Sequence, residues 1–310
     1  MHNYRISGLA VASQLELPGA IDAPGADLGP DITVRLQCVP EALEGAIAGG
    51  PTWEMAGERV LLRVPRLARI LIEAGRHIGV ELAPGASERD ASIFVLGTSF
   101  GILLHQRGTT TLHGAAVARD GVAMAICGAS GAGKSTLATA LCDAGFEFVA
   151  DDICALGLDR ERRPVVLPDG RQLKLWRESI DQLDVAAARQ GEAVRDGFEK
   201  YYVGAPVTAA VAPALSAIYV LRDARPPLSP GIEPLNLPDA MRMLDVQAYR
   251  PGIRANIGSR PQKLAQSAAV LRHARAFHFT RKRGFEHIEA VVGALLAHWE
   301  GLRGREAVKA

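Results

Sequence analysis

The chain has 310 residues, enough for two domains of about 150 residues each, with 48 % hydrophobic and 22 % charged residues. Its formal net charge of +1 gives no electrostatic argument for binding nucleic acid or an anionic membrane surface. The four cysteines have neither C-x-x-C nor zinc-ligand spacing. The N-terminal residues lack a secretory apolar core, and no window approaches 18 uninterrupted apolar residues, the length of a membrane span. We therefore expect a globular protein of a reducing compartment, the cytoplasm.

Residues 1–104 are expected to form a small β-rich domain. Short apolar stretches bounded by turn residues predict strands at 4–12, 32–38 and 60–64. A Pro- and Gly-rich stretch from Pro18 to Pro30 predicts a loop. Apolar residues at helical spacing predict helices at 67–74 and 91–104.

Residues 105–310 are expected to form an α/β domain. Strands at 112–118 and 122–127 flank Asp120-Gly121, a dipeptide typical of hairpin turns. A Gly-rich loop follows, and then a helix from Lys134 to Ala144 that ends at Gly145. Strands are then expected at 146–150, 165–167 and 173–175, the last two paired around Asp169-Gly170. A charged stretch at 178–203 is expected to be helical or mobile. The remaining expected elements are a strand at 215–221, a loop at 226–238, a helix at 261–274, a strand at 276–280 and a helix at 284–301.

The strongest motif lies between the second strand of this domain and the helix after it. The residues are Gly128, Ala129, Ser130, Gly131, Ala132, Gly133, Lys134 and Ser135, followed by Thr136. They match G-x-x-x-x-G-K-[ST], the P-loop, whose backbone N–H groups bind phosphate. In such a loop Lys134 reaches the β- and γ-phosphates and Ser135 binds Mg²⁺. The alternative is a chance match in a Gly-rich chain, which the flanking strand and helix disfavour.

Two adjacent acids, Asp151 and Asp152, end the strand at 146–150. One acid can hold Mg²⁺ and the other can accept a proton from a hydroxyl, which favours phosphoryl transfer to an alcohol. The alternative is a strand-end turn or a helix cap. His113 lies on the strand that pairs with the one entering the P-loop, where it can orient a carboxylate. The alternative there is a histidine packed in the core.

Taken together, His113-Gly114, the P-loop and Gly145–Asp152 resemble the HPr kinase/phosphorylase family. That family has a His-Gly strand, a G-x-S-G-x-G-K-S loop and a strand that ends in Ala-Asp-Asp. The resemblance covers residues 112–152. It implies an α/β P-loop kinase domain of the type shared with phosphoenolpyruvate carboxykinase, with ATP and Mg²⁺ as cofactors.

The resemblance also implies roles, position by position. Asp151 would be the general base and His113 its partner, while Asp152 and Ser135 would bind Mg²⁺. Lys134 and the loop amides would hold the nucleotide phosphates. Phosphorolysis is not implied, because Thr136 replaces a family Glu and the Glu-Ile-Arg-Gly-Leu-Gly sequence is missing.

The chain is also similar to HPr-kinase-like proteins found beside lasso-peptide biosynthesis genes. The similar segments are 97–101, 112–114, 174–176 and 200–202. This similarity implies a kinase that phosphorylates the hydroxyl of the C-terminal Ser of a lasso precursor peptide. The members of the HPr kinase/phosphorylase family that catalyse both reactions assemble into rings, but the sequence itself shows no interface, so the oligomeric state stays open with a homo-oligomer as one alternative.

Three other functions stay open from the residues. They are an HPr serine kinase of carbon regulation, a small-molecule kinase with the same machinery, and a nucleotide-sensing subunit without catalysis. Several basic residues are candidates for neutralising phosphate or for attracting an acidic leader peptide, although each is alternatively a solvated surface residue. They are Lys174, Arg177, Lys200, Arg250, Arg254 and the run Arg281-Lys282-Arg283.

Overall fold

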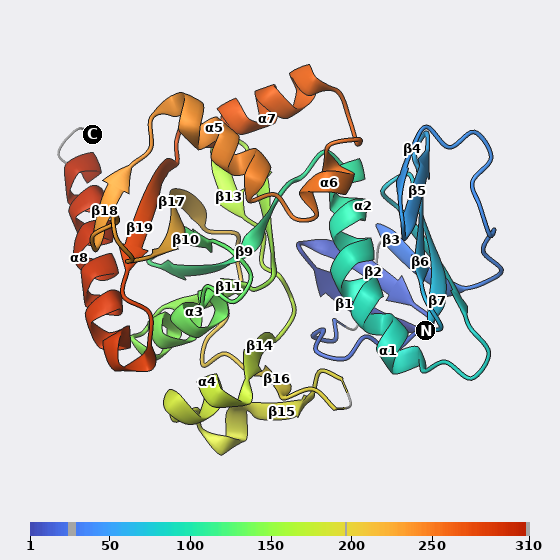
Figure 1. The fold of residues 1–310 in the computed structure, drawn as a ribbon, viewed down its shortest axis with the longest axis horizontal. Helices are drawn as coiled ribbons and strands as arrows, with labels where there is room; N and C mark the ends of the chain where they lie inside the picture. The colour runs from blue at the N-terminus through green and yellow to red at the C-terminus, as the bar shows by residue number, and fades with distance from the viewer. Residues whose placement is uncertain (24–28, 196, 308–310) are drawn as a thin grey trace.

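The computed structural model describes residues 1–23, 29–195 and 197–307. Over these residues the protein is a mixed α/β structure with two eight-stranded sheets and a three-stranded one (Figure 1). Residues 24–28 of the loop expected from Pro18 to Pro30 lie outside the described part. Among the described residues, no helix has the length and apolar character needed to cross a membrane.

The first sheet is built from the N-terminal residues. In spatial order its strands are β1 (His2–Ile6), β2 (Leu9–Ser13), β3 (Ile32–Leu36), β8 (His77–Leu82), β7 (Ala68–Glu73), β6 (Arg59–Val64), β5 (Trp53–Ala56) and β4 (Ala48–Gly50). Side chains alternate between the two faces along each strand, so Val60 and Leu62 enter the main core while Leu61 faces a smaller cluster with Val39 and Leu43. The β-rich character expected for this region is confirmed.

The helix predicted at 67–74 is wrong, because this segment is strand β7. Left-handed backbone at Arg66 and Ala74 (φ 61° and 50°) turns the chain at both ends, so β7 pairs with β6 and β8 as successive hairpins. Its β-branched Ile70 and Ile72 share one buried face, a spacing of two that fits a strand.

The helix predicted at 91–104 is confirmed as a helical segment. It comprises α1 (Glu88–Phe94), a π-helical turn (Val95–Ser99) and α2 (Phe100–Gln106). The Ser87 side chain caps its start by accepting a hydrogen bond from the Asp90 N–H. Its buried face packs on the first sheet, and the same core includes Ile153 and Tyr249 from the later chain. The domain boundary at residue 104 therefore stays a prediction.

The second sheet carries the P-loop. Its strands follow the order β10 (Val122–Cys127), β9 (Thr110–Arg119), β12 (Ile153–Leu158), β13 (Pro164–Val166), β17 (Ala214–Asp223), β19 (Arg275–Arg281) and β18 (Gly231–Pro234), with β11 (Glu147–Ala150) paired to β9. Strand β10 is antiparallel to β9 and parallel to β17. The predicted hairpin at Asp120-Gly121 is confirmed, with positive φ at both residues.

Helices cover both faces of this sheet. On one face the core joins Met124 and Ile126 of β10 to α3 (Lys134–Asp143) and α8 (Ile288–Ala307). On the other face Ala123 and Ala125 pack with α5 (Leu237–Val246) and α7 (Arg260–Leu271). The short helix α6 (Pro251–Arg254) lies between α5 and α7 in the chain and near α2 in space (Figure 1).

The third sheet was not expected. It consists of β14 (Leu173–Trp176), β16 (Lys200–Val203) and β15 (Gln190–Ala193), with α4 (Arg177–Gln182) and a 3₁₀ turn (Ala187–Arg189) beside it. The predicted pairing of 165–167 with 173–175 is wrong. The Asp169 and Gly170 carbonyls accept from the Ser7 and Ile21 N–H groups, so this turn binds the first sheet and does not close a hairpin.

Candidate active site

The Gly-rich loop follows the end of β10 and leads directly into α3. Gly133 has φ 80° at the N-terminus of α3, and Gly128 has φ 147° beside Leu221 of β17. A side chain at either position would be strained, which accounts for the two glycines. The loop N–H groups and the N-terminus of α3 make a region suited to bind phosphate oxygens. The predicted order of strand, loop and helix is present, and phosphate binding by residues 128–136 stays a prediction.

Lys134 folds back over this loop. Its Nζ donates hydrogen bonds to the carbonyls of Gly128 (3.1 Å) and Ala129 (3.0 Å). Burial lowers the pKa of the ammonium group, although the charges of Asp151 and Asp152 oppose that shift. Lys134 thus lies where the loop meets the two acids.

The first acid faces the loop serine. The Ser135 hydroxyl donates to Oδ1 of Asp151 at 2.7 Å, and the Lys174 N–H donates to Oδ2 at 3.2 Å. Asp151 is buried directly after β11, beside the start of α3. A hydroxyl and a carboxylate oxygen are ligands that Mg²⁺ accepts, and Mg²⁺ usually binds one or two carboxylates plus substrate phosphates. Ser135 and Asp151 fit that ion. Within the described residues, no group of three or more His, Cys, Asp or Glu side chains is arranged to hold a metal.

The second acid faces the histidine. Nδ1 of His113 lies 3.2 Å from Oδ1 of Asp152 and 3.1 Å from its carbonyl oxygen. Burial tends to raise the pKa of the Asp152 carboxyl, but the hydrogen bond with His113 and the charges of Lys174 and Arg171 hold it well below its ordinary value. Asp152 is therefore ionised at neutral pH.

The structure corrects the expected partners of the two acids. We expected His113 to partner Asp151 and Ser135 to act with Asp152. Instead, Ser135 contacts Asp151 and His113 contacts Asp152. The register of β12 against β9 places Ile153 opposite His113, which brings the preceding residue, Asp152, beside the imidazole. Asp152 has left-handed backbone (φ 70°), so the two carboxylates point to different partners. All four side chains still gather at one end of the second sheet.

Two further residues support this arrangement and were not singled out from the sequence. Asp169 and Arg171 form a buried ion pair at 2.6 Å, and Asp169 also accepts from the Asp151 N–H at 3.4 Å. Burial raises the pKa of Asp169 to about 6, although Arg171 opposes the shift. Arg171 donates to the Leu96 carbonyl of the π-helical turn. In sequence these residues flank a glycine and resemble an ordinary turn.

Gln247 is another residue that sequence reasoning missed. Its side-chain Oε1 accepts from the Gly128 N–H at 3.0 Å, and its carbonyl accepts from the His113 N–H at 2.7 Å. The residue after α5 thus fixes both the loop and the histidine strand. Nothing local in the sequence marks this position, because both contacts come from distant segments.

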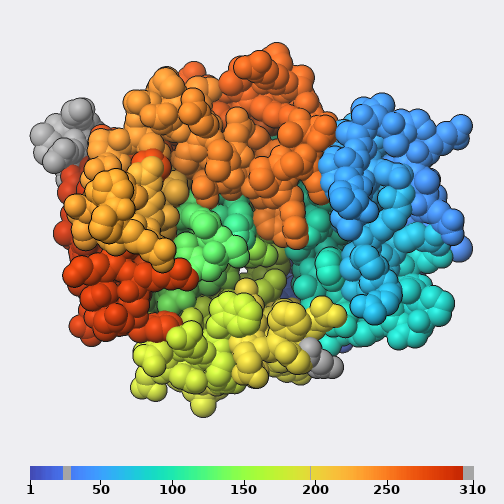
Figure 2. Space-filling view, in the orientation of Figure 1, coloured from blue at the N-terminus to red at the C-terminus, as the bar shows by residue number. Residues whose placement is uncertain are grey.

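Of the basic candidates, Lys174 and Lys200 lie on the third sheet beside the acids. Burial lowers the pKa of Lys174, and Asp152 opposes the shift while Lys200 adds to it. Nζ of Lys200 lies 5.7 Å from the centre of the exposed Trp176 ring. In Figure 2 the surface is hollowed where the green P-loop region, the yellow-green third sheet and the orange segment meet.

The remaining basic candidates have other partners. Arg177 stacks on Tyr201, Arg250 donates to Thr98 at 2.8 Å, and Arg254 binds Asp245. Thr136 of the loop lies 3.1 Å from the Ser179 hydroxyl of α4.

The basic run at 281–283 lies on the P-loop, although a solvated turn was the alternative expected for it. Arg281 donates to the Ala132 carbonyl, and Arg283 donates to the Gly131 carbonyl at 2.5 Å. Arg281 and Arg283, at and after the end of β19, therefore stabilise the P-loop through its backbone carbonyls.

Comparisons with known proteins gave two negative results and a structural similarity over part of the chain. No known family model matches it, and no curated protein matches it. Among solved structures, the Hpr(Ser) kinase/phosphatase from Coxiella burnetii is similar with 14 % identity and a TM-score of 0.36. The similarity covers 64 % of this chain and 96 % of that chain. A likeness this weak assigns no role to any residue, so the roles of the site residues are inferred from their own contacts.

Proposed function

We propose that this protein is a Mg²⁺- and ATP-dependent kinase that phosphorylates the C-terminal Ser hydroxyl of a lasso precursor peptide. The observation that carries the kinase proposal is the pair of adjacent acids beside the P-loop, each with a different partner. Asp151 binds the loop Ser135, and Asp152 binds His113. Simple P-loop hydrolases usually have one acid at this place, so a second acid favours transfer to an alcohol, whose hydroxyl proton it can accept.

The roles follow from these contacts. The loop N–H groups and Lys134 hold the β- and γ-phosphates, and Ser135 with Asp151 holds Mg²⁺. The metal supplies charge neutralisation on the phosphate oxygens. This assignment exchanges the roles that the family resemblance implies for Asp151 and Asp152, because Asp151 is the acid hydrogen-bonded to the loop serine.

Asp152 then faces the acceptor. In the transfer, the serine oxygen forms a bond to the γ-phosphorus, the bond to the bridging β,γ-oxygen breaks, and ADP leaves. The hydroxyl proton passes to the Asp152 carboxylate, which His113 orients through Nδ1. Because the transition state of phosphoryl transfer is loose, an ionised carboxylate of low pKa serves mainly to orient the hydroxyl and collect its proton late.

The third sheet supplies positive charge on the acceptor side. Lys174 and Lys200 come from adjacent strands, β14 and β16, and each lies close enough to influence the ionisation of the loop lysine or of the acids. Cations at this place stabilise the negative charge of the transferring phosphoryl group. The exposed Trp176 beside Lys200 offers an apolar surface to a peptide.

The peptide acceptor is proposed because four segments are similar to HPr-kinase-like proteins found beside lasso-peptide biosynthesis genes. These segments are 97–101, 112–114, 174–176 and 200–202. The test incubates the protein with Mg·ATP and two acceptors, a lasso precursor that ends in Ser and HPr, and reads intact masses. We expect one phosphate increment on the precursor, lost when its last Ser becomes Ala. An increment on HPr alone would assign the protein to carbon regulation, and modification of neither would favour another acceptor or a nucleotide sensor.

A further inference from the structure

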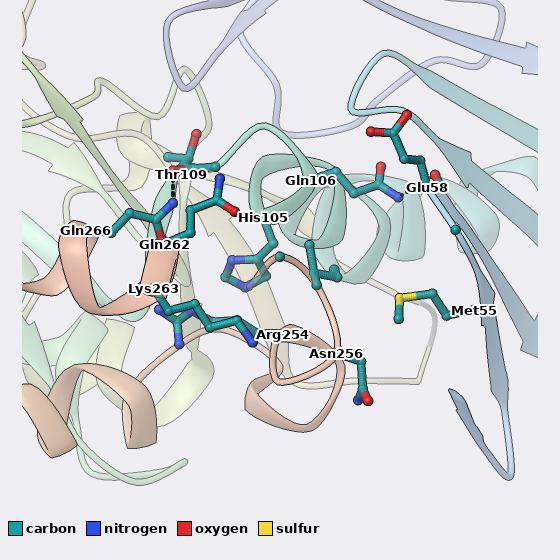
Figure 3. A pocket seen from close by; sticks show the side chains of 14 residues that line it. Met55, Glu58, His105, Gln106, Thr109, Arg254, Asn256, Gln262, Lys263 and Gln266 are labelled. Carbon is teal, nitrogen blue, oxygen red and sulfur yellow. Dashed lines mark hydrogen bonds between the residues drawn. The ribbon is translucent and has the colours of Figure 1, made fainter. Parts of the chain in front are cut away.

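A separate cavity of about 230 Å³ lies between the first sheet and helices α2, α6 and α7. In Figure 3 its wall carries Lys263, Gln266 and Arg254 on one side and Glu58 on the other, with His105 between them. Neither the P-loop residues nor the two acids that follow β11 are among the described residues that line it. The cavity is therefore distinct from the candidate active site.

The wall contains a buried guanidinium with an unused donor. Arg254 and His105 are each only 6 % exposed. Nη1 of Arg254 donates to Asp245 at 2.5 Å, whereas the buried Nη2 has no hydrogen-bond partner among the described residues. A buried N–H group without a partner costs free energy, so a ligand or water that accepts from it is favoured.

The basic side chains of this cavity influence one another. Burial lowers the pKa of Lys263 and the charge of Arg254 lowers it further, although Asp245 opposes the shift. Burial also lowers the pKa of His105 to about 4, with Arg254 and Lys263 adding to the shift against the backbone hydrogen bonds. His105 is thus neutral at pH 7, and Arg254 and Lys263 repel each other.

Little negative charge offsets this repulsion. Glu58 is the acidic residue among those that line the cavity, and it is exposed to water. Asp245, the partner of Arg254, has a side chain that is 58 % exposed, so water screens much of its charge. A small anion between Arg254 and Lys263 would neutralise both cations at once.

We propose that this cavity binds a small oxyanion, a phosphate group or a carboxylate, between Arg254 and Lys263. The Gln262 amide lines the same wall and adds a neutral hydrogen-bond donor. The polar lining and modest volume suit an inorganic anion or a small metabolite, not a macromolecule.

The first test measures binding of inorganic phosphate and, separately, of malonate by calorimetry. The background is Lys134→Ala, which removes the P-loop lysine so that the second site is seen alone. Lys263→Gln should lower the affinity for the preferred anion by about tenfold, which corresponds to the loss of one charge-assisted hydrogen bond. The control is Arg272→Gln, an exposed basic residue that follows α7 and does not line the cavity, and it should leave the affinity unchanged.

The second test places the anion in the cavity. A bound anion offsets the charges of Arg254 and Lys263, so it should shift the NMR resonance of the His105 ring, assigned with His105→Gln. Where Lys134→Ala does not fold, comparing wild type with Lys263→Gln by this resonance decides in its place. Absence of binding by either probe up to about 10 mM, above the range of ordinary metabolite affinities, would overturn the proposal. Equal affinity in Lys263→Gln, or an unmoved His105 resonance, would also overturn it.

Discussion

The Ser135 hydroxyl lies 2.7 Å from Oδ1 of Asp151, whereas the neighbouring Asp152 turns to His113. Two consecutive carboxylates are therefore separated into two environments, one at the P-loop serine and one at the histidine. This separation allows a metal-binding role and a proton-accepting role to lie within one dipeptide, and the two roles make different predictions for substitution.

Asp152→Asn should remove phosphoryl transfer and leave nucleotide binding intact. The amide keeps the shape but cannot take up the hydroxyl proton, so turnover should fall by about 10²–10⁴-fold, the usual contribution of a general base. Turnover is read from intact masses of the acceptor and binding from ATP titration with Mg²⁺. A wild-type rate in this variant would falsify the proton-accepting role.

Asp151→Asn should reduce the extent to which Mg²⁺ strengthens ATP binding. The Ser135 hydroxyl would lose its carboxylate partner, so ATP affinity in Mg²⁺ should approach the affinity measured in EDTA. The two titrations are compared in wild type and in the variant. If Mg²⁺ still strengthens ATP binding to the same extent, Asp151 does not hold the ion, and the roles implied by the family resemblance regain support.

Lys134→Ala should abolish transfer and weaken ATP binding, since we propose that its ammonium group binds the β- and γ-phosphates. The matched control is Arg35→Ala, an exposed basic residue on β3 of the first sheet. It should transfer phosphate like wild type. An active Lys134→Ala protein would mean that the nucleotide binds elsewhere.

His105 should make the protein less stable as the pH falls. Its pKa is lowered from 6.5 to about 4 in the folded state, so below pH 6.5 the unfolded chain binds more protons than the folded one. The free energy of unfolding therefore falls between pH 6.5 and 4, by at most about 3 kcal/mol from this group. Urea denaturation at pH 7 and pH 4.5 should show a smaller drop for His105→Gln than for wild type. The exposed His273→Gln is the control and should follow wild type.

Arg171→Met should destabilise the protein by about 3–5 kcal/mol, because it leaves the buried Asp169 carboxyl without its counter-charge. The double variant Asp169→Leu/Arg171→Met should cost less than the single one, since it removes both charges. Urea denaturation measures both. If the double variant is less stable than Arg171→Met, the ion pair stabilises the fold by more than the neutralisation of its two buried charges.

Local patterns were sufficient for much of the second sheet. The Asp120-Gly121 hairpin, the P-loop with its helix, and the strand before Asp151 each depend on residues within about 15 positions of one another, where turn chemistry and periodicity act. Segment 67–74 shows where local sequence patterns fail to predict the secondary structure. Its apolar spacing fits a helix, but pairing with two neighbouring strands decides its conformation.

The missed contacts of the site come from residues far apart in the chain. Gln247 binds Gly128 across 119 positions, and Arg171 binds the Leu96 carbonyl across 75. The exchange of partners between the two acids depends on the register of β12 against β9. Periodicity carries no information on register between strands that are distant in sequence, so these features required the structure.

The left-handed backbone of Asp152 limits which residues can be accepted there, apart from any chemistry. Glycine and asparagine adopt this conformation readily and β-branched residues do so at a cost. In a library with every amino acid at residue 152, selected only for soluble folded protein, the survivors should be enriched in Gly, Asn and Asp and poor in Val, Ile and Thr. The mutational tolerance of this one position thus reports its dihedral angle, and that readout is independent of whether any substrate has been identified.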